Sequence, residues 1–230
     1  MKKIFFVAGE VSGDRLAAWY INKLRAQYSD LDIHGVGGPC LRDAGAQLHD
    51  VYDKLNLVGI VEIIKHLPFI VRYISALANH IINNKFDTVV VVDFPGFNLR
   101  LIKLLKHMNP AINIIYLSPP QLWCWGAWRV KKLKKYCDNV VVIYPFEVAW
   151  YASRGLTVEW IGTPVAELLV PYRSLAYNKT RFIALIPGSR RSEVETLLPI
   201  FLQAAVMLKQ KYHDVQFVLP LASSIKQDVL

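Results

Sequence analysis

The run of four valines at residues 89–92 limits the possible folds of this chain more than any other stretch. It is preceded by Asp87 and Thr88 and followed by Asp93. Four consecutive β-branched residues between turn signals are typical of a central strand that is buried on both faces. Such strands occur in parallel sheets with helices on both sides. The sequence therefore predicts an α/β fold.

Further β-rich apolar runs alternate with helical patterns along the chain. We expect strands at residues 3–8, 32–36, 113–117, 139–143 and 158–161. With the valine run they predict a Rossmann-like, doubly wound parallel sheet of six or seven strands in a domain over residues 1–163. Residues 164–180 are polar, which predicts an irregular linker. Residues 181–230 then predict a second β-α-β unit.

Composition narrows the class of protein. Of the 230 residues, 53% are hydrophobic and 20% are charged, which allows a sizeable core. The formal charge of +9 predicts an anionic partner: nucleic acid, an acidic lipid surface or a phosphorylated substrate. The three cysteines are widely spaced and form no disulfide or metal pattern, which fits a reducing compartment. Because no apolar run reaches the roughly 18–20 residues of a spanning helix, we expect a cytoplasmic protein.

The turn after the first expected strand is a candidate ligand site, because open α/β sheets bind ligands where strands end and helices begin. The spacing of Gly9 and Gly13 does not match the dinucleotide-binding pattern. The carboxylate of Glu10 suits sugar hydroxyls or a proton-accepting role. Ser12 and Asp14 have an equally good alternative role, in which Ser12 caps the next helix and Asp14 complements its dipole.

Asp93 stands at the tip of the valine strand, where it could accept a proton or bind a hydroxyl. A desolvated environment would raise the pKa of its carboxyl group. The alternative is that Asp93 only caps the following helix. Asn98 could likewise face a ligand or stabilise the turn.

A loop with two prolines and two tryptophans follows the strand at 113–117 and includes Ser118 and Trp123. Its aromatic faces could stack on sugars or acyl chains, although packing alone would also explain them. Residues 126–136 then carry one arginine and four lysines. This run is either an ordinary solvated face or a contact for acidic phospholipid headgroups or a phosphorylated acceptor. Nucleic acid is the weaker interpretation, because no recognised binding module accompanies the charges.

Residues 57–82 are strongly apolar with basic flanks. Their helical spacing predicts one apolar face, which on most chains is ordinary core. The alternative is a surface that dips into a membrane. On that interpretation the membrane-facing residues are Ile63, Ile64, Leu67, Ile70, Val71 and Ile74.

The turn at residues 187–193 opens the helix of the second β-α-β unit. A glycine, Ser189 and Arg190 at a helix N-terminus can hold a diphosphate through backbone donors, the dipole and the guanidinium group. A capping box would explain Glu193 but not Arg190.

Taken together, these motifs resemble those of the lipid-A-disaccharide synthases. Each motif alone is modest, but seven in the family's order are specific. The matching segments are 8–14, 58–62, Asp93 to Asn98, Ser118 to Trp125, 145–147, 161–162 and 187–193.

The resemblance implies an inverting glycosyltransferase of the GT-B type, with two Rossmann-like domains facing each other across a cleft. Such enzymes transfer 2,3-diacylglucosamine from its UDP-sugar to 2,3-diacylglucosamine 1-phosphate, which forms a β-1,6-linked disaccharide and UDP. They act at the cytoplasmic face of the inner membrane, which favours the membrane interpretation of residues 57–82. We expect neither a cofactor nor a metal, and a homodimer is left open.

By position, the resemblance makes Asp93 the candidate general base for the acceptor 6-hydroxyl, with Glu10 as runner-up. The substrate-binding residues are then Gly9, Ser12, Gly13, Asn98, Ser118, Trp123, Ser189, Arg190 and Glu193. Of these, Arg190 with Ser189 would face the UDP diphosphate and stabilise the departing charge.

This chain departs from the family pattern at three points. It carries Thr163 where histidine is frequent, and it has the doubled Pro119-Pro120. It also holds only the start of the second domain. We therefore expect catalysis to require the missing part. Two alternatives stay open: a non-catalytic module that binds acylglucosamine phosphate or membrane lipid, and another GT-B enzyme acting on UDP-sugars, such as an epimerase.

Overall fold

The computed structural model describes residues 2–51, 67–172, 182–189, 191–221 and 225. The chain divides into two compact units, Met1–Pro171 and Tyr172–Leu230, and each is described by itself.

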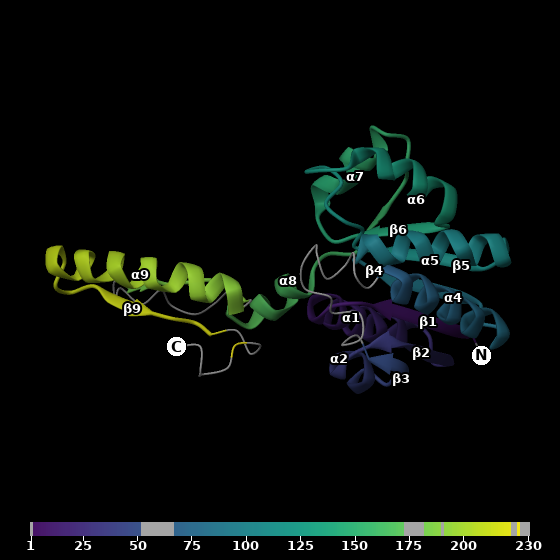
Figure 1. Ribbon diagram of the computed structural model, residues 1–230, viewed down its shortest axis with the longest axis horizontal. Coiled ribbons are helices and arrows are strands. Elements are labelled where there is room, and N and C mark those ends of the chain that lie inside the picture. The colour runs from purple at the N-terminus through teal and green to yellow at the C-terminus, as the bar shows by residue number, and fades with distance from the viewer. Residues whose placement is uncertain (1, 52–66, 173–181, 190, 222–224, 226–230) are drawn as a thin grey trace. The chain divides into compact units, whose positions relative to one another are not determined.

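The first unit alternates strands and helices, as the sequence predicts (Figure 1). Its elements are β1 (Lys2–Ala8), α1 (Val11–Gln27), β2 (Leu31–Gly37), α2 (Pro39–Asp43), β3 (Gln47–Val51), α4 (Leu67–Asn83), β4 (Thr88–Val92), α5 (Pro95–Met108), β5 (Asn113–Leu117), the 3-10 turn η2 (Ala127–Arg129), α6 (Val130–Tyr136), β6 (Asn139–Val142), α7 (Pro145–Ala152), β7 (Glu159–Trp160) and α8 (Pro164–Leu169).

Seven strands form one sheet in the order β3-β2-β1-β4-β5-β6-β7, and every neighbouring pair is parallel. The valine strand β4 lies at its centre, where Val89 pairs with Phe5 of β1 and with Ile114 of β5. The predicted α/β fold is confirmed. Strand β3 at the edge was not among the expected strands.

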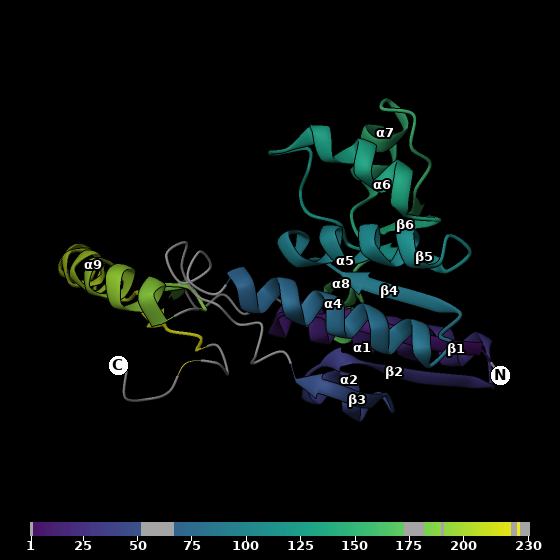
Figure 2. The same cartoon turned by 45° about the vertical axis from the view of Figure 1, so that its right-hand side comes forward.

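Helices cover both faces of the sheet, so the fold is doubly wound (Figures 1 and 2). Side chains alternate along a strand, and β4 therefore contributes to two separate cores. Val89 and Val91 pack in the core with α4, α5, α6 and α7. Val90 and Val92 pack in the opposite core with α1 and α2. This two-sided burial is why all four positions are apolar.

The residues for which a membrane-facing role is predicted differ in their exposure on helix α4. Ile74 is 5% exposed and belongs to the core, and Ile70 packs partly against the same core. The predicted membrane-facing role of Ile74 is therefore wrong, because this side chain packs against the sheet. Val71 is 51% exposed. Ile63, Ile64 and the side chain of Leu67 lie outside the described residues. Within the described ranges, no helix is long and apolar enough to cross a membrane.

The expected linker at 164–180 begins with helix instead of irregular chain. Residues 164–169 form α8, followed by the 3-10 turn η3 (Val170–Tyr172). The carboxylate of Glu167 accepts hydrogen bonds from Trp19 Nε1 (2.7 Å) and Lys23 Nζ (2.6 Å) of α1. These contacts between distant segments tie α8 to the first unit.

The second unit contains the predicted β-α-β arrangement. Strands β8 (Phe182–Ala184) and β9 (Gln216–Val218) pair in parallel, and helix α9 (Arg191–Lys211) connects them. Val194, Leu198 and Val215 are among its buried side chains.

Candidate functional site

The strand order places a topological switch point between β1 and β4. From β1 the chain continues to β2 and β3 on one side, and from β4 it continues to β5, β6 and β7 on the other. Ligands of open α/β sheets bind outside the carboxyl ends of the strands at such a point. Glu10 follows β1 and Asp93 follows β4, so both predicted catalytic carboxylates belong to this edge.

The backbone at this edge adopts an uncommon conformation. Asp93, Phe94 and Ser118 have positive φ angles of 43°, 44° and 49°. A non-glycine residue in this left-handed region costs on the order of 1–3 kcal/mol, and such residues gather at functional sites. The carbonyl of Asp93 accepts hydrogen bonds from Tyr116 Oη (2.7 Å) and Asn98 Nδ2 (2.8 Å). These two donors hold the turn that carries the Asp93 carboxyl group.

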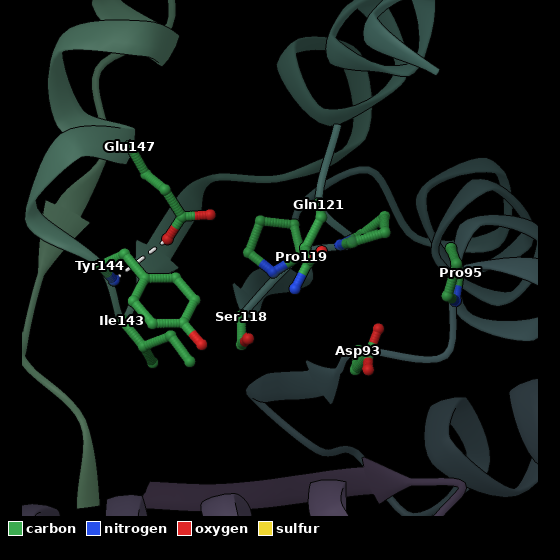
Figure 3. A pocket seen from close by; sticks show the side chains of 9 residues that line it. Asp93, Pro95, Ser118, Pro119, Gln121, Ile143, Tyr144 and Glu147 are labelled. Atoms are coloured by element: carbon green, nitrogen blue, oxygen red, sulfur yellow. Dashed lines mark hydrogen bonds between the residues drawn. The ribbon is translucent and has the colours of Figure 1, made fainter. Parts of the chain in front are cut away.

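A pocket of about 330 Å³ opens at the ends of β4, β5 and β6 (Figure 3). Asp93 and Glu147 lie on opposite sides of it, with the segment from Ser118 to Gln121 between them. Its full lining is Asp93, Pro95, Ser118, Pro119, Pro120, Gln121, Ile143, Tyr144 and Glu147. The pocket therefore combines two carboxyl groups with hydroxyl, amide and apolar groups, a mixture that suits a sugar.

Burial raises the pKa of the Asp93 carboxyl group, and the nearby Glu10 carboxylate raises it further. A hydrogen bond from the Phe94 backbone acts in the opposite direction. Asp93 does not cap α5, because the N-cap position is Phe94 and no side chain caps that helix. The capping alternative for Asp93 is therefore not observed, and its carboxyl group faces the pocket.

Glu147 is a pocket residue that the sequence analysis did not select. Its side chain is 3% exposed and accepts a 3.1 Å hydrogen bond from the Tyr144 backbone N–H. Burial raises the pKa of its carboxyl group. The available signal was the 145–147 motif that follows the expected strand at 139–143, although Glu147 itself lies in the first turn of α7 and not at the strand tip as Asp93 does.

In the turn after β1, the polar residues do not follow the predicted capping pattern, in which Ser12 caps α1. Glu10 occupies the N-cap position of α1 without a side-chain cap, and Ser12 is exposed within the first helical turn. Ser12 is therefore not the cap. Asp14 is 1% exposed, and its carboxylate accepts backbone N–H groups at the start of α2. The donors are Gly38 (2.7 Å), Cys40 (2.9 Å) and Leu41 (3.1 Å).

Of the two glycines of this turn, packing requires Gly9 but not Gly13. A Cβ atom added to Gly9 would lie 2.6 Å from the Phe94 ring, so only glycine lets that ring approach. Gly13 is buried in α1, where an added Cβ would meet Ala8 and Val92 at ordinary contact distances. A substrate contact for either glycine stays a prediction.

The remaining predicted residues of the first unit fall near the pocket. Asn98 is fully buried and its Nδ2 stabilises the turn, while its Oδ1 has no hydrogen-bond partner within the described structure. Ser118 lines the pocket. Trp123 is 37% exposed and meets Phe146 edge-on at 5.2 Å between ring centroids.

In the second unit, Gly188 has a φ of 124°, which favours glycine. The Ser189 backbone N–H donates a 3.1 Å hydrogen bond to Glu193 Oε2, as the capping alternative predicts for Glu193. Arg190 lies outside the described residues, so its diphosphate-binding role stays a prediction. Within the part of the chain that the structure describes, no three His, Cys, Asp or Glu side chains gather as a metal site.

Comparison with known proteins identifies relatives over the whole chain. The family model described as lipid-A-disaccharide synthetase matches residues 4–230. A lipid-A-disaccharide synthase of Trichlorobacter lovleyi is 39% identical over 100% of this chain and 61% of its own length. One of Coxiella burnetii is 35% identical over 99% of this chain and 62% of its own length. The chain thus spans about three fifths of these curated relatives.

Solved structures share the fold at low sequence identity. An S. aureus MnaA–UDP co-structure has a TM-score of 0.63 at 16% identity and covers 100% of this chain and 64% of its own. A UDP-N-acetylglucosamine 2-epimerase has a TM-score of 0.63 at 11% identity and covers 98% of this chain and 69% of its own. These matches confirm the GT-B type of the predicted fold.

Proposed function

This chain belongs to the lipid-A-disaccharide synthetase family, and we propose that it supplies the acceptor-binding side and the general base of that glycosyltransferase. The reaction joins 2,3-diacylglucosamine from its UDP-sugar to 2,3-diacylglucosamine 1-phosphate and releases UDP. The observation that carries the proposal is the carboxyl group of Asp93, which stands at the switch point, lines the pocket and has a raised pKa.

In the proposed step, the Asp93 carboxylate takes the proton of the acceptor 6-hydroxyl. The acceptor oxygen then forms a bond to C1 of the donor sugar while the bond from C1 to the UDP oxygen breaks, which inverts the configuration at C1. A carboxylate with a raised pKa is a stronger proton acceptor than an ordinary carboxylate. Glu10 supports this role through its charge, which raises the pKa of Asp93.

Departure of UDP requires stabilisation of the negative charge that forms on its diphosphate. We assign this role to Arg190 with Ser189 at the start of α9, because a guanidinium group and a helix N-terminus both favour phosphate oxygens. On this assignment no metal ion or cofactor takes part. Gly9, Ser12, Gly13, Asn98 and Trp123 complete the substrate-binding set that the family resemblance implies.

Both substrates carry acyl chains, so we place the reaction at the cytoplasmic face of the inner membrane, with the protein bound peripherally. The basic character of the chain, with a formal charge of +9, supports contact with an anionic lipid surface.

The assay uses both acylated substrates dispersed in detergent and measures disaccharide by mass spectrometry and UDP release. It is run on the chain alone and on the chain mixed with the part of the Trichlorobacter lovleyi relative that lies beyond the matched region. We expect disaccharide in the mixture. Binding of the acceptor without any product, with both parts folded, would instead support a non-catalytic binding module.

The fold alone would also suit an epimerase, because solved structures with this fold carry that name. Incubation with UDP-N-acetylglucosamine as the sole substrate tests this alternative. We expect no epimerised product, and its appearance would contradict the proposed reaction.

A further inference from the structure

One face of the first unit combines exposed tryptophans with lysines, and we call it the Trp–Lys surface. It comprises the exposed residues Trp125, Trp128, Lys131, Lys132 and Lys135, together with the half-buried Arg129. Trp125 and Trp128 are 66% and 59% exposed, although tryptophan is normally well buried in a folded domain. The function proposed above does not use either side chain.

The geometry of η2 and α6 brings these residues together. Val130 and Leu133 face the core, with exposed fractions of 4% and 0%. The opposite side of the same turns carries Trp128, Lys131 and Lys132, which are neighbours at spacings of three and four residues. Lys135 continues this row, because it follows Lys131 by four residues. Tryptophan and lysine therefore share the side that faces away from the sheet.

The tryptophans and Arg129 form an ordered cluster. The rings of Trp125 and Trp128 meet edge-on, with centroids 5.2 Å apart and planes at 79°. The guanidinium carbon of Arg129 lies 4.8 Å from the Trp125 ring centroid and 5.7 Å from that of Trp128. These cation–π contacts fix the rings in an exposed arrangement.

The charge of this surface is not neutralised within the described structure. Residues 125–136 contain one arginine and four lysines but no aspartate or glutamate. Among the described residues, no ion pair joins Lys131, Lys132 or Lys135 to a carboxylate. A partner with negative charge would therefore complement this surface.

We propose that the Trp–Lys surface docks this protein onto an anionic phospholipid bilayer. Tryptophan is enriched at the membrane–water interface, where its apolar body and N–H group are both accommodated. Lysines that lie against acidic headgroups add electrostatic attraction. Residues 125–136 supply both features in one exposed segment.

The position of the surface relative to the pocket fits this role. Trp123 lies two residues before Trp125 and packs edge-on against Phe146, which stacks with the pocket residue Tyr144. The Trp–Lys surface thus begins in the same loop that, from Ser118 to Gln121, lines the pocket. The benefit of membrane docking near the pocket rests on the proposed function, which makes the substrates acylated. Docking itself does not require a substrate.

The test is co-flotation of the whole chain with vesicles of phosphatidylcholine that contain phosphatidylglycerol, without any sugar substrate. We expect binding that decreases with added salt and is absent from pure phosphatidylcholine. Lys131→Gln/Lys132→Gln/Lys135→Gln and Trp125→Ser/Trp128→Ser should each weaken binding by roughly tenfold or more. The charge-matched control Arg42→Gln/Lys103→Gln/Lys211→Gln should bind within about twofold of the unmodified chain.

A second control separates this surface from α4. Phe69→Ser/Val71→Ser removes two exposed apolar side chains of α4. Loss of binding in this variant but not in the Trp–Lys variants would overturn the proposal and favour the α4 interpretation. Tight binding of a single-stranded oligonucleotide that is lost in the Trp–Lys variants would also overturn it, in favour of a nucleic-acid partner.

Cys124 provides a direct probe, because it is exposed between Trp123 and Trp125 whereas Cys40 and Cys137 are partly buried. A polarity-sensitive fluorophore on Cys124, in a Cys40→Ala/Cys137→Ala background, should shift to shorter wavelength when anionic vesicles are added. Binding with an unchanged spectrum would place the lipid contact elsewhere and contradict the proposal. Because no substrate is present, failure here would leave the glycosyl-transfer proposal intact.

Discussion

The hydroxyl group of Tyr116 on β5 donates a 2.7 Å hydrogen bond to the backbone carbonyl of Asp93 at the end of the neighbouring strand β4. Asn98 of α5 donates to the same carbonyl at 2.8 Å. Two elements thus fix the left-handed backbone of Asp93, and the direction of its carboxyl group follows from that backbone. The proposed base is thus positioned by two donors to its main-chain carbonyl, and the Phe94 backbone adds a hydrogen bond to its carboxyl group.

Tyr116→Phe should therefore affect both stability and turnover. Loss of one buried hydrogen bond should reduce the free energy of unfolding by about 1 kcal/mol, as measured by urea denaturation. Turnover in the completed enzyme should fall by more than the loss of stability alone would cause, because the Asp93 carbonyl loses one of its two side-chain donors. Tyr73→Phe is the matched control, since the Tyr73 hydroxyl donates to Asp50 away from the pocket. An unchanged rate in Tyr116→Phe would remove the positioning role.

Glu10→Gln should lower the pKa of Asp93, because the Glu10 carboxylate is one of the two causes that raise it. The acidic limb of the pH–rate profile should then move to lower pH. NMR titration of the Asp93 side-chain carbon tests the same shift in the chain alone. If Glu10 were the base instead, Glu10→Gln would abolish turnover at every pH.

Asp14→Ala should destabilise the first unit strongly. The variant leaves the backbone N–H groups of Gly38, Cys40 and Leu41 without their carboxylate acceptor. We expect a loss of at least about 3 kcal/mol in the free energy of unfolding. Ser12→Ala, only two residues away, should cost less than about 0.5 kcal/mol because Ser12 is exposed. Similar small losses in both variants would contradict the role given to Asp14.

Stability should fall as the solution is acidified through the ordinary titration range of histidine. Burial lowers the pKa of His80 below its usual 6.5, and the nearby His49 and His34 lower it further. The rings of His49 and His80 are stacked with centroids 3.7 Å apart. Below pH 6.5 the unfolded chain thus binds a proton that the folded chain resists, so the free energy of unfolding decreases as pH falls.

Urea denaturation at neutral and mildly acidic pH measures this effect. His80→Gln should show a weaker dependence on pH than the unmodified chain. His107→Gln, at an exposed position of α5, should retain the full dependence. Equal dependence in all three proteins would exclude His80 as the cause.

The sequence predicts the centre of the fold better than its periphery. The valine strand could be assigned because burial on both faces leaves a uniform apolar run. Edge strand β3, with the sequence Gln47-Leu48-His49-Asp50-Val51, has no such run, because its side chains are alternately exposed and half-buried. Helix α8 was missed although Pro164 at its first position and the helix formers Ala166 to Leu169 are local helix signals. The contacts of Glu167 with distant Trp19 and Lys23 could not be read from the local sequence.

In the candidate site, too, some residues could be predicted from the sequence and others could not. Asp93 could be selected because a carboxylate at the end of a buried parallel strand has few structural reasons to be there. The role of Asp14 could not be predicted, because its carboxylate binds backbone groups about 25 residues further along the chain. Helical spacing likewise grouped Ile74 with Val71, although only packing against the sheet decides which of them is buried.

The most direct test of the central claim is the rate of disaccharide formation by Asp93→Asn in the completed enzyme, with acceptor binding measured in parallel. Asparagine keeps the size of the side chain but cannot accept the hydroxyl proton. We predict that transfer slows by roughly 10²–10⁴-fold while acceptor affinity changes little. A transfer rate equal to that of the unmodified enzyme would show that Asp93 is not the base and would contradict this account.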